Sequence, residues 1–114
     1  MEETLFDKIL KSEIPADVVY EDEHVLAFRD INPQAPVHVL VIPRTRIVSL
    51  AESTALPAEA VGNFIHGVTR TARALALEEG GYRVVFNTGA DAQQTVAYVH
   101  AHILGGRKLS WPPG

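Results

Sequence analysis

Short apolar runs recur along the chain between prolines, glycines and charged residues, and they predict five β-strands. The last run alternates most clearly. In it Val99, Ala101 and Ile103 would face a core, while two histidines would share the opposite face of the strand. The first two runs are close enough to form a hairpin. The predicted strands are residues 18–20, 25–28, 37–42, 82–86 and 98–104.

A short helix is predicted near the start of the chain. Thr4 is a good N-cap residue, and Asp7 in the first turn suits the positive end of the helix dipole. A proline disfavours helical backbone in the residue before it. The helix should therefore run to about Ser12 and stop before Pro15.

A longer helix is predicted between the third and fourth strands. It would begin at Pro57, whose fixed φ suits the first helical position, and end before Gly80. Residues 47–50 should form a short helical turn ahead of it, and His66 should be exposed because it lies off the apolar stripe. The stripe consists of Val61, Ile65, Val68, Ala72 and Leu75.

Together these elements predict an α+β fold. Most of the strands are joined by loops or hairpins, which favours antiparallel pairing in one five-stranded sheet. The long helix must then cover one face of that sheet. At 114 residues the chain has a common size for a single domain, which we expect to span residues 1–114.

Composition and charge narrow the classes of partner. A hydrophobic fraction of 46% and a charged fraction of 21% are ordinary for a soluble globular protein. The net charge is −4, and basic residues pair closely only at Arg44/Arg46 and Arg107/Lys108, so we expect no nucleic-acid groove. The chain has no cysteine, no signal peptide pattern and no membrane-length apolar run, which predicts a cytoplasmic protein that binds no membrane.

The candidate chemistry of the chain lies in three histidines. His100 and His102 would place their imidazoles about 7 Å apart on one face of a strand. His38 is the one polar side chain in the apolar strand 37–42. Because an unpaired buried polar group costs about 1–3 kcal/mol, a core histidine bonded to a backbone carbonyl is the simplest interpretation of His38 alone.

Three interpretations of these histidines stay open on physical grounds. The three could bind zinc, although no Asp or Glu between Thr95 and Gly114 could orient the imidazoles of the last strand. An imidazole could instead attack phosphorus or an acyl carbon, with donors such as Asn87 and Thr95 nearby for the developing charge. The pair could also be structural, on a solvated face of the sheet.

Several separated motifs resemble those of the histidine triad (HIT) family. His100-Ala101-His102-Ile103-Leu104 resembles the family signature, and residues 28–38 resemble its ribose-binding loop and following strand, which residues 40–43 continue. Residues 81–87 and the ending Trp111-Pro112-Pro113-Gly114 resemble the Hint branch of purine nucleoside phosphoramidases. The resemblance covers nearly the whole chain.

The resemblance implies a fold, an activity and a partner. It implies a HIT-like five-stranded antiparallel sheet with one long helix and a short N-terminal helix, in a homodimer. We expect no metal and no cofactor. It implies binding of purine nucleoside monophosphates and hydrolysis of phosphoramidates, such as AMP linked to an amine or lysine, through a nucleotidyl-histidine. Two alternatives stay open: a nucleotide-binding protein with weak or lost turnover, and a hydrolase of dinucleoside polyphosphates.

The resemblance also implies roles for individual residues. His100 falls at the nucleophile, His102 at the histidine that contacts the phosphate, and His38 at the histidine that hydrogen-bonds the nucleophile's other nitrogen. Asn87 and Thr95 fall at phosphate-contacting positions. The remaining substrate-binding residues would be Gln93 in the phosphate loop, Asp30 for the ribose hydroxyls, and Phe6, Ile9, Phe28, Arg29, Ile31, Leu40 and Val96 around base and sugar.

Two departures from the family pattern lie in the expected site. Tyr98 stands where the family has its first triad histidine, and tyrosine does not take up charge near neutral pH. Ala92 and Gln93 stand where the phosphate loop usually has two glycines. If those positions need positive φ, the replacement costs about 1 kcal/mol or reshapes the loop.

Overall fold

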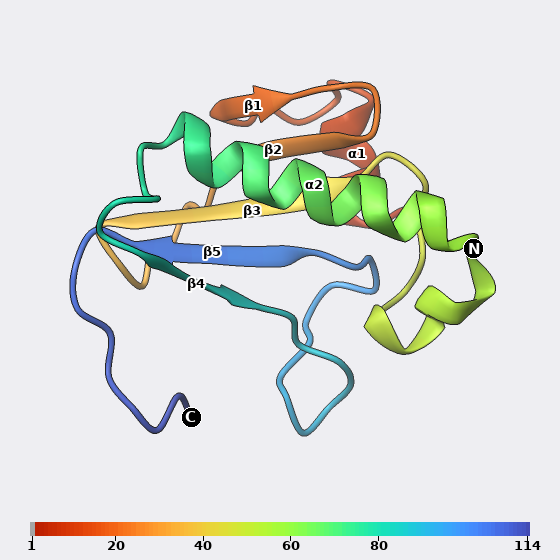
Figure 1. Cartoon of the computed structure of the whole chain (residues 1–114). Helices are drawn as coiled ribbons and strands as arrows, with labels where there is room; N and C mark the ends of the chain where they lie inside the picture. The colour runs from red at the N-terminus through yellow and green to blue at the C-terminus, as the bar shows by residue number, and fades with distance from the viewer. Residues whose placement is uncertain (1) are drawn as a thin grey trace.

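The structure, a computed structural model, describes residues 2–114 and confirms the predicted α+β fold. All neighbouring strands are antiparallel, in the order β1-β2-β3-β5-β4 (Figure 1). The elements in chain order are α1 (Leu5–Leu10), β1 (Val18–Glu21), β2 (Val25–Arg29), β3 (Val37–Pro43), the 3₁₀ helix η1 (Leu50–Ala55), α2 (Ala58–Ala74), β4 (Tyr82–Val85) and β5 (Ala101–Gly105).

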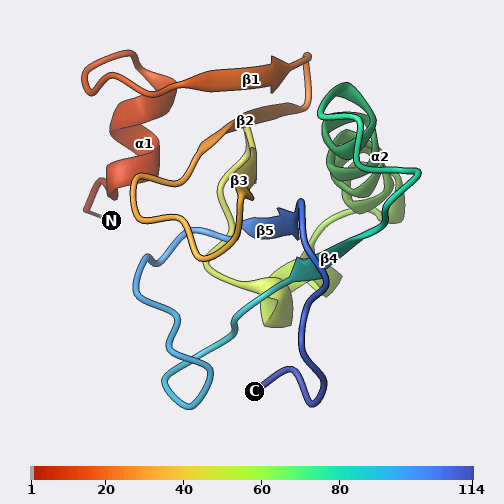
Figure 2. The same cartoon turned by 90° about the vertical axis from the view of Figure 1, so that its left-hand side faces the viewer.

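Two apolar clusters lie on the two faces of the sheet. Figure 2 shows α1 on one side of the sheet and α2 on the other. Side chains alternate along β2, so Val25 and Ala27 pack under α2 while Leu26 and Phe28 pack on the α1 side. The buried members of the α1-side cluster are Phe6, Leu26, Phe28, Leu40, Ile42 and Tyr98.

Helix α2 begins one residue later and ends earlier than the sequence predicts. Pro57 is its N-cap, and the helix ends at Ala74 rather than just before Gly80. A Schellman motif closes it: the Leu77 N–H donates to the Ala72 oxygen at 3.1 Å, and Ala76 takes the left-handed conformation with φ 58°. The prediction was wrong because an alanine occupies the position at which we expected a glycine.

The buried face of α2 also differs from the predicted stripe. Ile65 is 41% exposed, whereas the unpredicted Phe64 is buried. Adjacent helical residues point about 100° apart, so a face centred on Phe64 and Val68 leaves Ile65 at its edge. His66 is exposed, as predicted. The helical turn expected at residues 47–50 is instead η1, which starts at Leu50.

Strand β5 begins three residues later than the predicted strand. The Tyr98 N–H donates to the Val96 oxygen at 2.9 Å and the Val99 N–H to the Ile47 oxygen at 2.8 Å, so neither joins a strand ladder. The predicted alternation nevertheless holds, because Val99 packs on the α2 side and Tyr98 on the α1 side. His100 is thus the last residue before regular pairing begins.

The predicted cap of α1 is present as a reciprocal capping box. The Asp7 N–H donates to Thr4 Oγ1 at 3.3 Å, and the Thr4 N–H donates to Asp7 Oδ2 at 2.7 Å. These bonds fix the start of a helix of only six residues. The buried Phe6 then anchors α1 on the sheet.

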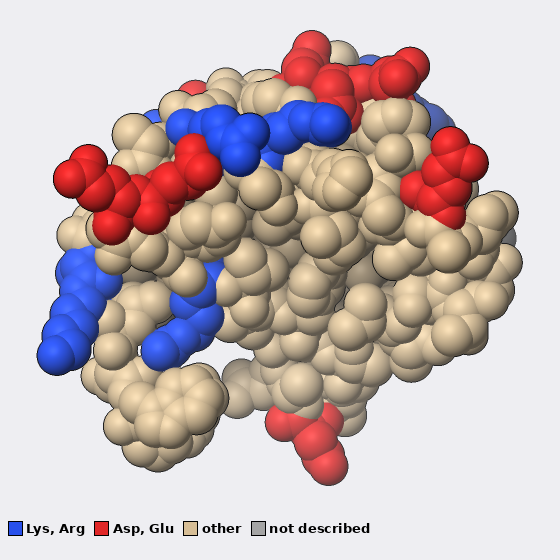
Figure 3. All heavy atoms as spheres, viewed as in Figure 1, with Lys and Arg blue, Asp and Glu red and all other residues tan. Residues whose placement is uncertain are grey.

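The surface on the α2 side carries charges of both signs in small groups. Figure 3 shows no continuous basic stripe on this face of the described chain. Within residues 2–114, no helix is long and apolar enough to cross a membrane.

Candidate active site

His100 is the side chain from which the site is built. Its imidazole is 7% exposed, and its Nδ1 lies 2.7 Å from the backbone oxygen of Tyr98. A carbonyl oxygen can only accept, so Nδ1 carries the hydrogen and Nε2 of the neutral ring keeps its lone pair. The Phe6 ring packs edge-on against the imidazole, with ring centres 4.9 Å apart. His100 therefore presents an unprotonated nitrogen in a fixed orientation.

His38 and His102 form a hydrogen-bonded pair across β3 and β5. The Gln34 N–H donates to His38 Nδ1 at 3.0 Å, so the hydrogen of neutral His38 must lie on Nε2. This Nε2 is 2.9 Å from His102 Nδ1 and donates to it. The hydrogen of neutral His102 then lies on its own Nε2. Within residues 2–114, that buried nitrogen has no hydrogen-bond partner.

This arrangement corrects the role expected for His38. His38 does not bond the second nitrogen of His100, because that nitrogen is held by the backbone of Tyr98. The reason is the strand register. His38 lies opposite Leu104, two residues from His102, whereas His100 lies before the β3–β5 ladder begins.

Burial keeps the three imidazoles neutral at neutral pH. It lowers the pKa of His100 below the ordinary 6.5, although the Tyr98 carbonyl acts in the opposite direction. Burial likewise lowers the pKa of His38 against the opposing charge of Asp30. For His102, burial and the two neighbouring histidines lower the pKa to about 4. The site therefore offers one imidazole lone pair and one imidazole N–H.

An open cavity of about 790 Å³ joins these groups to helix α1. Most of its lining residues are apolar, and a few polar and charged side chains lie among them, as is typical of sites for small molecules. Of the residues predicted for the site, those that line it are Phe6, Ile9, Phe28, Arg29, Asp30, Ile31, Leu40, Thr95, Val96, His100 and His102.

Three predicted site residues lie outside the cavity lining. His38 is behind His102 and acts on the cavity through it. Asn87 follows β4, and Gln93 lies on the exposed loop before Thr95. Contacts of Asn87 and Gln93 with a phosphate stay predictions.

Other lining residues were not predicted from the sequence. They come from α1 and from the segment between α1 and β1, which has no periodicity and little chemistry to mark it. Arg29 holds this segment at the cavity: its N–H donates to the Asp17 oxygen at 3.0 Å, and its Nε lies 3.4 Å from the Asp17 carboxylate. The unpredicted residues are Leu5, Ile14, Pro15, Ala16 and Asp17.

Asp30 and Ile31 lie on the loop between β2 and β3, at the side of the cavity. Asp30 Oδ1 accepts the Asn32 N–H at 2.8 Å, while its Oδ2 lies 3.5 Å from His38 Nε2. Ile31 is 99% exposed. A large apolar side chain left in water beside an apolar cavity is well placed to contact a ligand.

Tyr98 does not take the place of a histidine in the cavity. Its side chain is fully buried in the α1-side cluster, and its hydroxyl donates to the Pro43 oxygen. Burial raises the pKa of Tyr98 to about 12, so the hydroxyl keeps its proton. The contribution of this residue to the site is its backbone oxygen, which any residue would supply.

The loop between β4 and β5 shows the strain that the missing glycines predict, at one of the two positions. Gln93 has φ 62°, in the left-handed region, whereas Ala92 does not have a positive φ. The Gln93 N–H donates to the Ala90 oxygen at 3.0 Å. The left-handed conformation of a residue with a Cβ costs about 1–2 kcal/mol.

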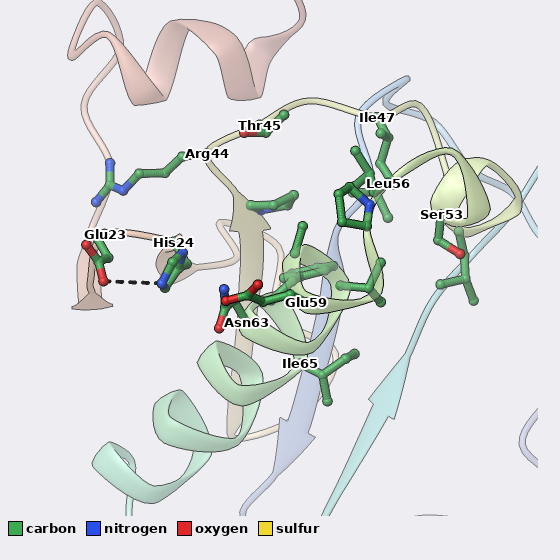
Figure 4. A pocket seen from close by; sticks show the side chains of 17 residues that line it. Glu23, His24, Arg44, Thr45, Ile47, Ser53, Leu56, Glu59, Asn63 and Ile65 are labelled. Carbon is green, nitrogen blue, oxygen red and sulfur yellow. Dashed lines mark ion pairs between the residues drawn. The ribbon is translucent and has the colours of Figure 1, made fainter.

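A second cavity of about 480 Å³ lies beside η1 and the start of α2 (Figure 4). The histidine in its lining is His24, whose Nε2 is 3.3 Å from the Glu23 carboxylate on the surface (Figure 4). His38, His100 and His102 do not line it. The candidate chemistry is thus confined to the larger cavity.

The sheet, the helices on its two faces and the cavity define an α+β domain with a preorganised imidazole site. The family model of the HIT domain matches residues 11–109, and this chain belongs to the HIT family. The chain is 50% identical to a 14 kDa zinc-binding protein of Zea mays, over 97% of this chain and 88% of the relative.

Two further relatives are described as enzymes. One, named adenylylsulfatase HINT1, comes from Arabidopsis thaliana; it is 44% identical over 97% of this chain and 76% of its own length. The other is the crystal structure of a HIT family hydrolase from Legionella pneumophila. It superposes with a TM-score of 0.89 at 44% identity, covering 98% of this chain and all of that chain.

The name of the maize relative raises the question of a metal. Asp30, His38 and His102 each offer one ligand atom, and these atoms lie within 4.8 Å of one another. The two imidazoles, however, share a hydrogen between Nε2 of His38 and Nδ1 of His102, 2.9 Å apart. A zinc ion would need both lone pairs and would have to displace that hydrogen. As arranged, the cluster does not fit zinc.

Proposed function

We propose that this protein hydrolyses purine nucleoside 5′-phosphoramidates through a nucleotidyl-histidine intermediate. The observation that carries the proposal is the complementary pair of imidazoles beside one cavity. His100 offers a lone pair on Nε2, and His102 offers a hydrogen on Nε2 that has no partner within residues 2–114. Membership of the HIT family, with relatives described as hydrolases, supports a hydrolytic reaction.

In the first step His100 Nε2 bonds to the α-phosphorus and the P–N bond breaks. The electron pair of that bond leaves with the amine, which takes one proton from solvent. The Tyr98 carbonyl stabilises the positive charge on the attacking imidazole, and His102 donates to a non-bridging phosphoryl oxygen. Water then attacks the phosphorus and loses one proton to solvent, the Nε2–P bond breaks, and its electron pair returns to His100.

The cavity suits the nucleoside part of such a substrate. Phe6, Phe28 and Leu40 supply apolar walls against which a purine packs. Asp30 is the candidate acceptor for ribose hydroxyls, since only one of its carboxylate oxygens accepts from the protein backbone. Tyrosine in place of the family's first histidine leaves the backbone oxygen that orients His100 unchanged. We therefore expect turnover to be retained at this site.

Hydrolysis of adenylyl sulfate is a second candidate. Because the pKa of His102 is about 4, its imidazole is neutral near pH 7. His102 can therefore donate a hydrogen bond, but it is a poor general acid for a leaving amine. Sulfate leaves as an anion and needs no proton, so the same attack by His100 on the α-phosphorus would release it. The name of the Arabidopsis thaliana relative, adenylylsulfatase HINT1, is consistent with this chemistry.

The test is steady-state hydrolysis of a fluorogenic AMP phosphoramidate, with adenylyl sulfate and a dinucleoside polyphosphate assayed in parallel. We expect turnover by the wild type and none by His100→Ala. His66→Ala is the matched control, because His66 is an exposed histidine on α2. An inactive wild type together with an active Tyr98→His variant would contradict the proposal and favour a nucleotide-binding protein with lost turnover. Hydrolysis of dinucleoside polyphosphates alone would favour the other alternative.

We further infer a homodimer in the cytoplasm. Strand β4 is at the edge of the sheet, and within residues 2–114 its outer side has no partner strand; Val84 on it is 37% exposed. The absence of cysteine agrees with a reducing compartment. Light scattering of the purified protein tests the dimer.

A further inference from the structure

We propose that Arg46 is a positioning residue that joins helix α1, one wall of the cavity, to the backbone that orients His100. Arg46 follows β3 and lies far from both partners in sequence. Its side chain is only 18% exposed, although arginine is among the residues least often buried. The inference rests on the proposed function, because it assigns Arg46 a part in organising that same site.

One end of the guanidinium binds the segment that carries α1. Arg46 Nη1 donates to Asp7 Oδ2 at 3.1 Å and to the Glu2 oxygen at 2.9 Å. The same Oδ2 of Asp7 accepts the Thr4 N–H in the capping box. Arg46 therefore binds the cap that fixes where α1 begins.

The other end binds the chain just before the nucleophile. Arg46 Nε and Nη2 both donate to the Ala97 oxygen, at 3.2 and 3.0 Å. The guanidinium carbon also lies 5.9 Å from the centre of the Tyr98 ring. Because the Tyr98 oxygen holds His100 Nδ1, a shift of this backbone turns the imidazole.

Arg46 donates the hydrogen bonds that join α1 and the residues before it to the rest of the chain, while Arg29 holds the segment after α1 through Asp17. Within residues 2–114, the hydrogen bonds that join residues 2–16 to the rest of the chain are both donated by Arg46. A six-residue helix is unstable alone, so its place depends on Arg46 and on the packing of Phe6. Loss of Arg46 should therefore loosen the cavity wall and the nucleophile together.

The test compares Arg46→Ala with three other variants. Arg46→Lys keeps the charge but cannot span both partners, so its effect should be intermediate. In Asp7→Asn the amide oxygen can still accept the Thr4 N–H, and the Ala97 contact stays, so only the α1 side is weakened. Arg44→Ala is the matched control, because Arg44 donates to the Asp22 oxygen at 2.8 Å, away from α1.

The expected results separate binding from chemistry. Arg46→Ala should raise KM and lower kcat for the AMP phosphoramidate, with a fall in kcat/KM of about 10- to 100-fold. Asp7→Asn should raise KM while kcat stays within about threefold of wild type. Arg44→Ala should change neither. A folded Arg46→Ala variant with wild-type kcat and KM would overturn the inference, as would equal losses in Arg44→Ala.

A second measurement keeps this test separate from the test of the proposed function. Hydrogen exchange of residues 4–10 and calorimetric binding of AMP need no turnover. If the wild type binds AMP but does not hydrolyse the substrate, the proposed function fails alone. Arg46→Ala should still lose AMP affinity and protection in α1. Unchanged affinity and protection would overturn the role of Arg46 whatever the activity.

Discussion

At the scale of residues, the partner of each Nδ1 decides what the matching Nε2 can do. A backbone oxygen holds Nδ1 of His100 and leaves a lone pair on Nε2, whereas His38 donates to Nδ1 of His102 and leaves a hydrogen there. Two imidazoles of one chemical type thus acquire opposite roles. The Gln34 N–H sets the second assignment from outside the cavity.

Removing the donor should slow the reaction without changing the nucleophile. We expect His102→Ala to lower kcat by about 10²–10³-fold, the usual loss when one donor to a developing negative charge is removed. Single-turnover kinetics should still show transfer of the nucleotide to His100, only more slowly. Loss of less than about threefold would mean that His102 does not stabilise the phosphoryl oxygen.

Tyr98 should matter for stability rather than for turnover. Tyr98→Phe leaves the buried Pro43 oxygen without its donor, so we expect a loss of about 1–2 kcal/mol in the free energy of unfolding. The value of kcat should stay within about threefold, since the Tyr98 backbone oxygen remains. Urea unfolding and steady-state kinetics of the same preparation measure both. A large fall in kcat in the folded variant would contradict this assignment.

At the scale of elements, the pattern of apolar residues predicted which segments form strands and helices, but not how each one ends. Alternation at residues 98–104 correctly separated the two faces, yet backbone bonds to Ile47 and Val96 delay the strand until Ala101. The end of α2 was missed because Ala76 adopts a conformation that sequence patterns assign to glycine. Such ends are decided by tertiary contacts and cap geometry.

The same limit applies to the candidate site. His38, His100 and His102 could be singled out because they carry recognisable chemistry, whereas Asp30, Phe6 and Ile9 were predicted only through the family resemblance. Residues 14–17 could not, because only the Arg29–Asp17 contacts bring that segment to the cavity. The partner of His38 depended on strand register, which the sequence does not specify to one residue.

The loop between β4 and β5 offers a matched pair of substitutions. Gln93→Gly should raise the free energy of unfolding by about 0.5–1 kcal/mol, because relief of the left-handed conformation exceeds the added freedom of the unfolded chain. Ala92→Gly should lower it by a similar amount, because Ala92 has no positive φ to relieve. Thermal unfolding of the two variants checks both signs. Equal shifts would show that neither position is strained.

At the scale of the whole molecule, the sheet separates a face that packs against α2 from a face that carries the candidate site. Helix α2 lies on one side of the sheet and α1 on the other (Figure 2). The cavity that His100 and His102 line is on the α1 side. Burial of three imidazoles on the second face links the stability of the whole fold to pH.

Stability should fall as the pH falls below neutrality. In the unfolded chain the histidines bind protons near pH 6.5. In the folded chain the pKa values of His38, His100 and His102 are lower, about 4 for His102, so these three bind protons only at lower pH. The unfolded state therefore binds more protons between these values, and the free energy of unfolding decreases as pH drops from 6.5 toward 4. Urea unfolding at several pH values measures this. His102→Asn should flatten the slope, and His66→Gln should leave it unchanged; the reverse pattern would contradict the account.

The central claim is that the nucleotide is transferred to His100 before water attacks the phosphorus. The stereochemistry at phosphorus tests this claim most directly. The substrate is an adenosine phosphoramidothioate of known configuration, hydrolysed in isotopically labelled water. Two successive in-line displacements, first by His100 and then by water, predict net retention of configuration, with a thioadenylyl group trapped on His100 after rapid quenching. Net inversion would mean a single direct attack by water, and it would contradict the account.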